Sequence, residues 1–430
     1  MFSSVSSLER TNRATVNTYS ANYGVPSVTV LHVNEHLAHK GGVETYLFGL
    51  LPRQTARGVT PVVAYGDGDP ALHEPARHVP ALGTAGFGAE RQARSQMENV
   101  LQEEAPDVVH VHNVQNVGAV QAGLAYGPTV VTTHDYRWVC PANNFFHERP
   151  QAICERTCGL GCFATTIAKR CVTPRPQYAA YFYRRAKWGI EHAERFARVI
   201  APSNGARKKY EASGFGEASM SVLPYFCELE PADTPRPVPD PPTITYLGRV
   251  AANKGHEYFI RALGQLPEAV RGLMVGGISG DVAQSLRALA EKHGCVDQLE
   301  LHGWASRSEV VDLLDRTSVF VFPSLWPETL GIVGIEALSR GVPVVASDVG
   351  GVREWCLEDE TGHLVPPKDR GAIADRVGRL LSVDGRLRAF GERGIALIRE
   401  KFRPEQHVDQ LLRLYQRAQT PTRSAAGTRV

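Results

Sequence analysis

The most constraining feature of this 430-residue sequence is a repeated alternation of short apolar runs with amphipathic stretches. Residues 27–33 (SVTVLHV) are typical of a buried parallel strand, and an apolar-periodic helix is expected over 41–51 after a short loop. The alternation continues through residues 62–133 and returns through 243–365. It indicates parallel sheets with helices on both faces. The expected fold class is α/β, with two Rossmann-like doubly wound sheets.

A chain of this length exceeds one ordinary hydrophobic core, so two domains facing across a cleft are expected. The proline-rich stretch 230–242 marks the passage between them. The expected segments are a disordered tail at 1–24, a first domain at 25–204 with an insertion at 136–176, a linker at 205–240, a second domain at 241–400, a helix at 401–418 that could pack back on the first domain, and a disordered tail at 419–430.

Composition restricts the partners. Lys and Arg number 47 against 45 Asp and Glu, so no overall field would hold the protein on nucleic acid or an acidic membrane. No apolar run is long enough to span a bilayer, and the first 24 residues have no apolar signal core, so a cytoplasmic protein is expected. Peripheral contact with the inner membrane face is an open alternative through the aromatic and basic helix 178–188, which could equally pack on the core.

Two loops at strand ends carry glycines and cations. Gly41 and Gly42 open the first expected helix, where backbone N–H groups could approach a phosphate, although a simple turn would look the same. In the second half, Gly248 and Arg249 follow a strand and Lys254 comes five residues later. An arginine fork and a lysine charge would neutralise a leaving pyrophosphate without a metal, whereas the competing interpretation is a solvated loop that caps a helix.

Two carboxylates stand eight residues apart at Glu328 and Glu336. A helix starting around Leu330 and Gly331 would put them on the same side, because two turns take about 7.2 residues. Its free amides would face a diphosphate while the carboxylates accept hydrogen bonds from hydroxyls. For Glu336, a solvated helix face is the alternative, but its neighbours are apolar.

These residues together resemble glycosyltransferase family 4, which has the GT-B fold. The resemblance rests on the paired glycines, Gly248-Arg249 with Lys254-Gly255, the spacing of the two glutamates, and the order of further short motifs. Those further motifs are Thr133-His134-Asp135, Ala201-Pro202-Ser203-Asn204, Gly341-Val-Pro-Val-Val-Ala and the stretch 348–354. One departure is Pro224-Tyr225-Phe226-Cys227, where many relatives have an Asn-Gly turn, and it puts the hinge between the domains in doubt.

The resemblance implies metal-independent transfer of a sugar, with retention, from a nucleoside-diphosphate sugar to a glycan or lipid-linked acceptor, in cell-envelope or surface polysaccharide synthesis. No cofactor is implied beyond the donor. By the resemblance, Arg249 and Lys254 clamp the diphosphate, Glu328 contacts sugar hydroxyls, Glu336 contacts the ribose, and His134 sits beside the reacting sugar. A strand-end histidine bonding backbone is the plainer interpretation of His134. The implied donor-binding set is Gly41, Gly42, Gly248, Arg249, Lys254, Glu328, Thr329, Leu330, Gly331 and Glu336.

Cysteines gather in the expected insertion. Cys154, Cys158 and Cys162 would share a helical face, and Cys171 or Cys140 could complete a tetrahedral zinc site. Free or redox-active thiols are the alternative, since Gly159 and Gly161 argue against a regular helix here.

Other functions remain to be weighed. A nucleotide-sugar epimerase or hydrolase would use the same donor residues without an acceptor. A binding module organised by a metal at the cysteines is disfavoured by the near-zero net charge and the donor-site residues. An NAD-dependent oxidoreductase is disfavoured because residues 275–280 lack the full G-x-G-x-x-G pattern.

Overall fold

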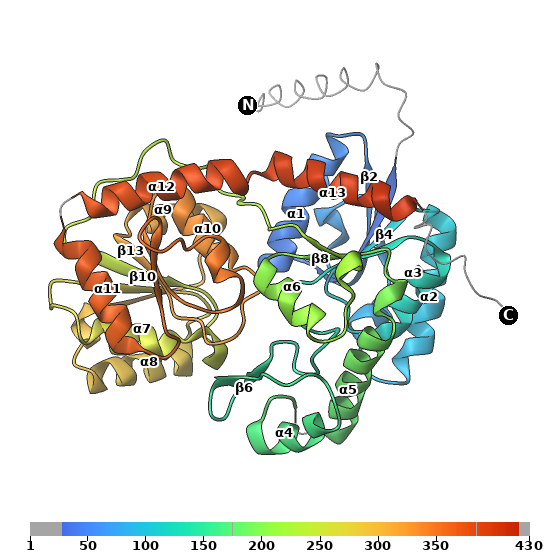
Figure 1. Cartoon of the computed structure of the whole chain (residues 1–430), viewed down its shortest axis with the longest axis horizontal. Helices are drawn as coiled ribbons and strands as arrows, with labels where there is room; N and C mark the ends of the chain where they lie inside the picture. Colours follow the sequence, from blue (N-terminus) through green and yellow to red (C-terminus); the bar gives the residue numbers. More distant parts are fainter. Residues whose placement is uncertain (1–27, 174, 384, 421–430) are drawn as a thin grey trace, which may run out of the picture.

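The computed structural model describes residues 28–173, 175–383 and 385–420. They form two α/β domains, each built on one parallel sheet (Figure 1). The first sheet has the strand order β3-β2-β1-β4-β5-β8-β9. Its strands are β1 (Thr29–Leu37), β2 (Thr60–Gly68), β3 (Ala76–His78), β4 (Val108–Val111), β5 (Thr129–Thr132), β8 (Arg198–Ala201) and β9 (Met220–Val222).

The second sheet has the order β12-β11-β10-β13-β14-β15, also wholly parallel. Its strands are β10 (Thr243–Leu247), β11 (Arg271–Val275), β12 (Leu299–Gly303), β13 (Val319–Phe322), β14 (Val344–Ser347) and β15 (Gly362–Val365). Strands such as β13 and β14 are buried at every position, because helices cover both faces of the sheet. The α/β fold class with two doubly wound sheets is therefore confirmed.

Helices follow the strands in both domains. In the first they are α1 (Gly42–Thr55), α2 (Ala89–Glu104), α3 (Val117–Tyr126), α5 (Pro176–Glu191) and α6 (Asn204–Glu211). In the second they are α7 (His256–Leu263), α8 (Gly280–Lys292), α9 (Arg307–Asp315), α10 (Ile332–Ser339), α11 (Arg370–Ser382) and α12 (Arg386–Lys401). The insertion after β5 holds a two-stranded antiparallel ribbon, β6 (Phe146–His147) and β7 (Ala152–Ile153), and the helix α4 (Gly161–Lys169).

The last helix, α13 (Pro404–Gln419), returns to the first domain (Figure 1). Its His407 donates from Nδ1 to the Pro224 carbonyl at 2.7 Å and accepts at Nε2 a 2.8 Å hydrogen bond from the Tyr46 hydroxyl of α1. Nearby, the backbone N–H of Cys227 donates to the carbonyl of Phe402 at 2.9 Å. The two segments that pass between the domains therefore run side by side.

The boundary of the first domain differs from the prediction. The helix α6, except for its first residue, and the strand β9 lie within 205–240, the range predicted as linker. The Ser203 hydroxyl caps α6 by accepting from the Ala206 N–H at 3.0 Å, and β9 adds a short edge strand beside β8. A three-residue strand gives almost no pattern in a sequence, so this element was missed. The predicted tails, 1–24 and 419–430, lie outside the described residues, apart from residues 419 and 420.

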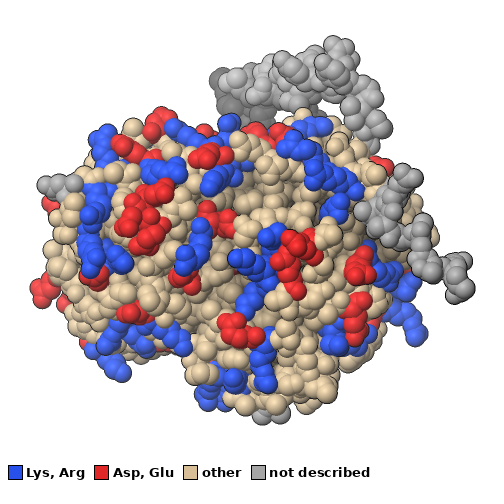
Figure 2. All heavy atoms as spheres, viewed as in Figure 1, with Lys and Arg blue, Asp and Glu red and all other residues tan. Residues whose placement is uncertain are grey.

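Acidic and basic side chains are interspersed over the face shown in Figure 2, with no broad patch of one sign. Within the part of the chain that the structure describes, no helix is both long and apolar enough to cross a bilayer.

Candidate active site

The strand order reverses between β10 and β13, and the loops after these two strands form the centre of the site. The loops are joined by a 2.8 Å hydrogen bond from the Leu325 N–H to the Asn253 carbonyl. Gly255 has φ +68°, and a Cβ there would lie 1.8 Å from the Pro323 carbonyl oxygen. Only glycine allows the two loops to approach this closely.

Lys254 and Glu328 are brought together by these loops. The Lys254 Nζ lies 2.6 Å from Glu328 Oε1, which also accepts a 2.6 Å hydrogen bond from the Ser324 hydroxyl. The Lys254 ammonium lies 5.0 Å from the centroid of the Trp326 ring. Because the Glu328 side chain is only 4% exposed, its charge is held by this lysine and hydroxyl rather than by water.

Arg249 differs from Lys254 in being exposed. Among the described residues its guanidinium forms no ion pair, so it is available to an anion from solvent. Gly248, beside it, places its carbonyl oxygen 2.0 Å from where a Cβ on Gly276 would be, so the loop after β10 and the loop after β11 are in backbone contact.

Glu336 and Glu328 have different partners. The helix α10 begins at Ile332, after Gly331 with φ +93°, so residues 328–331 are loop rather than helix. Glu328 therefore precedes the helix, and Glu336 lies within it. Glu336 is 3% exposed and is paired with Arg307 at the start of α9, whereas Glu328 is paired with Lys254.

The start of α10 faces the start of α1 across the domain interface. A Cβ on Gly42 would lie 3.4 Å from the Ile332 side chain, which places Gly41 and Gly42 beside the second domain. Close by, the Thr329 hydroxyl donates to the His134 carbonyl at 3.2 Å. Leu330 is fully buried, and its carbonyl accepts from the Trp355 indole at 2.7 Å.

The His134 ring faces the interior of the first domain. Its Nε2 lies 3.0 Å from His112 Nδ1, and the His112 Nε2 lies 3.0 Å from His32 Nδ1. This row of hydrogen-bonded histidines ends on one side at Gln54 Oε1, 2.8 Å from His32 Nε2. It ends on the other side at the Tyr225 hydroxyl, 2.7 Å from His134 Nδ1.

Burial determines the protonation state of these three histidines. It lowers the pKa of His32 to about 4 and that of His134 to about 3. It also lowers the pKa of His112 well below its usual range, and neighbouring histidines add to the effect. All three rings are therefore neutral near pH 7, with one N–H and one acceptor nitrogen each.

The tautomers follow from the Gln54 carbonyl oxygen, which can only accept. His32 must donate from Nε2 and accept at Nδ1, so His112 donates from Nε2 to His32. His134 then donates from Nε2 to His112 and accepts at Nδ1 from the Tyr225 hydroxyl. Both ring nitrogens of His134 are engaged, and its contact with the second domain is through its backbone carbonyl.

A buried charge cluster beside His134 was missed by the sequence analysis. Arg137 is 5% exposed and pairs with Asp135, with Nη2 to Oδ2 at 2.8 Å, and lies 3.5 Å from Glu35. Burial alone would raise the pKa of Asp135, but Arg137 outweighs it and holds that pKa below its usual range. The signal available in the sequence was the pair Asp135 and Arg137, which stand two residues apart directly after Thr133-His134.

The basic residues of α5 have partners within the protein. Arg184 pairs with Glu90, Arg185 is fully buried and donates to the Arg137 carbonyl at 3.1 Å, and Lys187 pairs with Glu191 at 3.3 Å. Arg185 packs in the core, whereas the Arg184 and Lys187 side chains are each 40% exposed, so the helix combines a core-packing face with a basic outer face.

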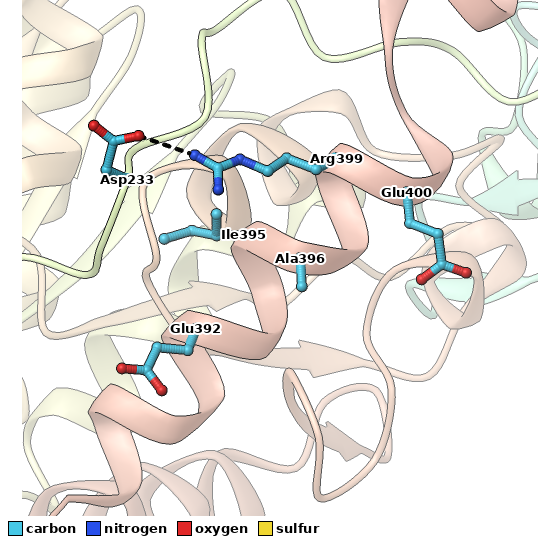
Figure 3. Close-up of a pocket in the computed structure, with 6 residues that line it drawn as sticks. All are labelled: Asp233, Glu392, Ile395, Ala396, Arg399 and Glu400. Carbon is cyan, nitrogen blue, oxygen red and sulfur yellow. Dashed lines mark hydrogen bonds and ion pairs between the residues drawn. The ribbon is translucent and has the colours of Figure 1, made fainter.

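Two hollows lie away from the loops after β10 and β13. One, on the outer face of α12, is lined by residues such as Asp233 and Arg399, which form a 3.2 Å ion pair (Figure 3). The other lies in the insertion and is lined by Cys140 and by the four cysteines of the predicted zinc set.

Two Rossmann-like domains, with cations and helix starts meeting at their interface, define the class of GT-B proteins. The family model described as Glycosyltransferase Family 4 matches residues 40–230, and the model described as Glycosyl transferases group 1 matches residues 232–397. The chain belongs to the family 4 glycosyltransferases of the GT-B type.

Relatives and solved structures agree with this assignment. A D-inositol 3-phosphate glycosyltransferase from Xylanimonas cellulosilytica is 40% identical over 34% of this chain and 36% of that protein. An alpha-D-kanosaminyltransferase from Streptomyces kanamyceticus is 30% identical over 54% of this chain and 63% of that protein. The two alignments cover 36% and 63% of the relatives' lengths, so each spans less than two thirds of the relative. The sucrose-phosphate synthase of Thermosynechococcus elongatus shares the fold, with TM-score 0.71, 20% identity, and 90% and 98% of the two chains covered.

Proposed function

We propose that this protein transfers a sugar, with retention and without a catalytic metal, from a nucleoside-diphosphate sugar to an acceptor on the first domain. The observation that carries the proposal is the buried Lys254–Glu328 pair at the point where the strand order reverses, next to two helix starts that face each other. Basic side chains and free helix amides at one place suit a diphosphate.

In the proposed complex, Arg249, which is exposed, and Lys254 together hold the diphosphate. They neutralise the charge that develops as the diphosphate leaves. Glu328 is then free to accept from sugar hydroxyls, because the phosphate replaces it as partner of Lys254. Glu336 would contact the ribose, which requires Arg307 to move aside. Gly41 and Gly42 would approach the phosphates from the first domain.

Donor binding also requires a small separation of the domains. A methyl group on Gly42 would already touch Ile332, so there is little space between the starts of α1 and α10 for a diphosphate. The leaving phosphate itself could take the proton of the acceptor hydroxyl as the new glycosidic bond forms on the same face. Catalysis would then depend on positioning and charge stabilisation.

The acceptor is proposed to be a glycan or lipid-linked hydroxyl compound in envelope or surface polysaccharide synthesis. The name of the Xylanimonas relative points to an inositol phosphate acceptor for that protein. For this chain, a phosphorylated polyol is accordingly the first acceptor to assay.

The test is thermal stabilisation by UDP, GDP, ADP, dTDP and their sugars, compared in wild type, Arg249→Ala and Lys254→Ala. One nucleotide family should raise the melting temperature of the wild type, and both variants should lose that shift. Without ligand, Arg249→Ala should melt like the wild type because the side chain is exposed and unpaired within the described residues. Lys254→Ala should be less stable by about 1–3 kcal/mol, because it leaves the buried Glu328 carboxylate with one partner fewer.

The proposed donor site would be contradicted if no nucleotide stabilised the wild type, or if a nucleotide stabilised both variants as much as the wild type. Product analysis with and without acceptor then separates a transferase from an epimerase or hydrolase of the same fold. A product made equally well without acceptor would favour those alternatives.

A further inference from the structure

The insertion after β5 brings six metal-ligand side chains to one cavity. Its walls include five thiols and one imidazole, contributed by Cys140, Cys154, Cys158, Cys162, Cys171 and His147. All five cysteines are free thiols. The cavity is about 20 Å³, room for one water-sized particle and too small for a sugar.

His147 supplies an independent sign that something is missing from this cavity. The residue is only 4% exposed, yet its Nδ1 has no hydrogen-bond partner among the described residues. A buried ring nitrogen without a partner costs free energy. A bound ion would satisfy it.

The backbone holds these donors in place from four short segments. The Cys140 N–H donates to the Tyr136 carbonyl at 2.7 Å, and the Cys154 N–H donates to the Phe145 carbonyl at 2.6 Å. Cys162 is the second residue of α4, Cys158 lies four residues earlier in the segment before the helix, and both line the cavity. Cys171 follows the end of α4, where its sulfur lies 3.9 Å from the Thr165 hydroxyl.

Residues 136–146 of the insertion are held by the core of the first domain, in which Tyr136, Trp138 and Phe146 are buried. The part from Cys154 to Cys171 has less support: its regular structure is the nine-residue helix α4, and the Leu160 and Phe163 side chains are 80% and 41% exposed. A segment that buries so little apolar surface needs a disulfide or a metal to hold one conformation.

We propose that the cavity of the insertion binds one Zn²⁺ through four of these six side chains, with the Cys158 and Cys162 thiolates as two of the ligands. Sulfur and imidazole donors in a tetrahedral set are the ligands that structural zinc takes. Each coordinating thiol releases its proton to solvent on binding.

Binding requires side-chain rotation. Among the described residues, three donor atoms lie within 4.8 Å of one another only at His32, His110 and His112, and at Glu358, Asp359 and His363. The first of these groups is already satisfied by hydrogen bonds in the core, and the second is largely exposed and acidic. The thiols of the insertion must therefore close around the ion from their present rotamers.

The site would act on the enzyme by fixing the wall of the domain interface. Tyr136 donates its backbone N–H to the Asn143 carbonyl at 2.8 Å and packs edge-on against Trp326, 6.1 Å between ring centroids. Trp326 in turn lies over the Lys254 ammonium. On the other side, Lys368 of the second domain donates to the Pro150 carbonyl at 3.0 Å. An ordered insertion therefore supports contacts to both domains.

The test is the metal content of the full-length protein purified under reducing conditions without chelator. We expect about one zinc per chain, released by a thiol-specific mercurial, and a thiolate-to-metal charge-transfer band when Co²⁺ replaces it. The double variant Cys158→Ser/Cys162→Ser should lose the metal. Cys295→Ser is the matched control, because Cys295 is a buried free thiol in the second domain, bonded to the Ile260 carbonyl, and should keep it.

Two results would overturn the proposal: wild-type protein that contains no zinc and takes up neither Zn²⁺ nor Co²⁺ after reduction, or a Cys158–Cys162 disulfide in the active protein. If the double variant does not fold, limited proteolysis of wild type decides. Zinc removal should expose the insertion to cleavage and zinc return should protect it, and equal cleavage in both states would contradict the site. Neither readout depends on the nucleotide assays, so the two proposals can fail separately.

Discussion

At the scale of single residues, the hydrogen bonds that join His32, His112 and His134 predict which ring nitrogen of each histidine carries the proton. Because Gln54 can only accept, His32, His112 and His134 are all expected as Nε2–H tautomers. Nitrogen chemical shifts of the imidazoles in labelled protein would report this directly. Tyr225→Phe should leave His134 Nδ1 without a donor, lower stability by about 1–3 kcal/mol, and shift that nitrogen alone. Finding His134 as the Nδ1–H tautomer would contradict the hydrogen-bond direction.

His134 also shows what sequence could and could not predict. Its position at the end of a strand beside the second domain was predictable, because carboxyl ends of parallel strands meet at one edge of a sheet. The direction of its ring was not, since it depends on His32 in β1 and on His112, which directly follows β4. Likewise, the pairing of Lys254 with Glu328 depends on how two loops meet. Tyr225 belongs to the segment that departs from the family pattern, and its hydroxyl makes the hydrogen bond that orients the His134 ring.

At the scale of elements, the loop that holds Glu328 is supported from the other domain. The N–H of Gly351 donates to the Glu328 carbonyl at 2.7 Å, and Gly350, next to it, packs against Gly205 of α6. Helix periodicity does not describe Glu328, because α10 starts at Ile332 and Glu328 lies in the loop before it. The sequence therefore predicted which carboxylates are buried at the site better than it predicted which partners they have.

Gly205→Ala tests whether this support matters. A Cβ at residue 205 would lie 2.4 Å from the Gly350 carbonyl oxygen, so α6 and the turn at Gly350 must move apart. We expect kcat/KM to fall on the order of 10-fold, equivalent to about 1.4 kcal/mol, without loss of folding. Gly378→Ala in α11 is the matched control, because its Cβ meets nothing within 4 Å and should leave activity unchanged. Equal activity of the two variants would show that the contact is not needed.

At the scale of the whole molecule, α13 makes the first domain depend on the end of the chain. Its Tyr415 hydroxyl bonds His110 at 2.6 Å, and the Gln54 amide donates to the same hydroxyl at 3.3 Å. The histidines of β1 and β4, the end of α1 and the last helix thus share one buried network. Burial is the main cause of the low pKa values in it, so the whole network loses stability when any member is protonated.

Stability should therefore fall steeply in mild acid. The pKa is lowered in the folded state for five buried histidines, to about 4 for His32 and His407 and about 3 for His134, and well below 6.5 for His110 and His112. Such groups stabilise the fold above their unfolded pKa of about 6.5, and each loses about 1.4 kcal/mol per pH unit as pH falls below it. Urea unfolding between pH 7 and 5 measures the slope. His407→Gln should reduce it by about one proton. A slope that His407→Gln leaves intact would mean that this histidine is already protonated in the native network.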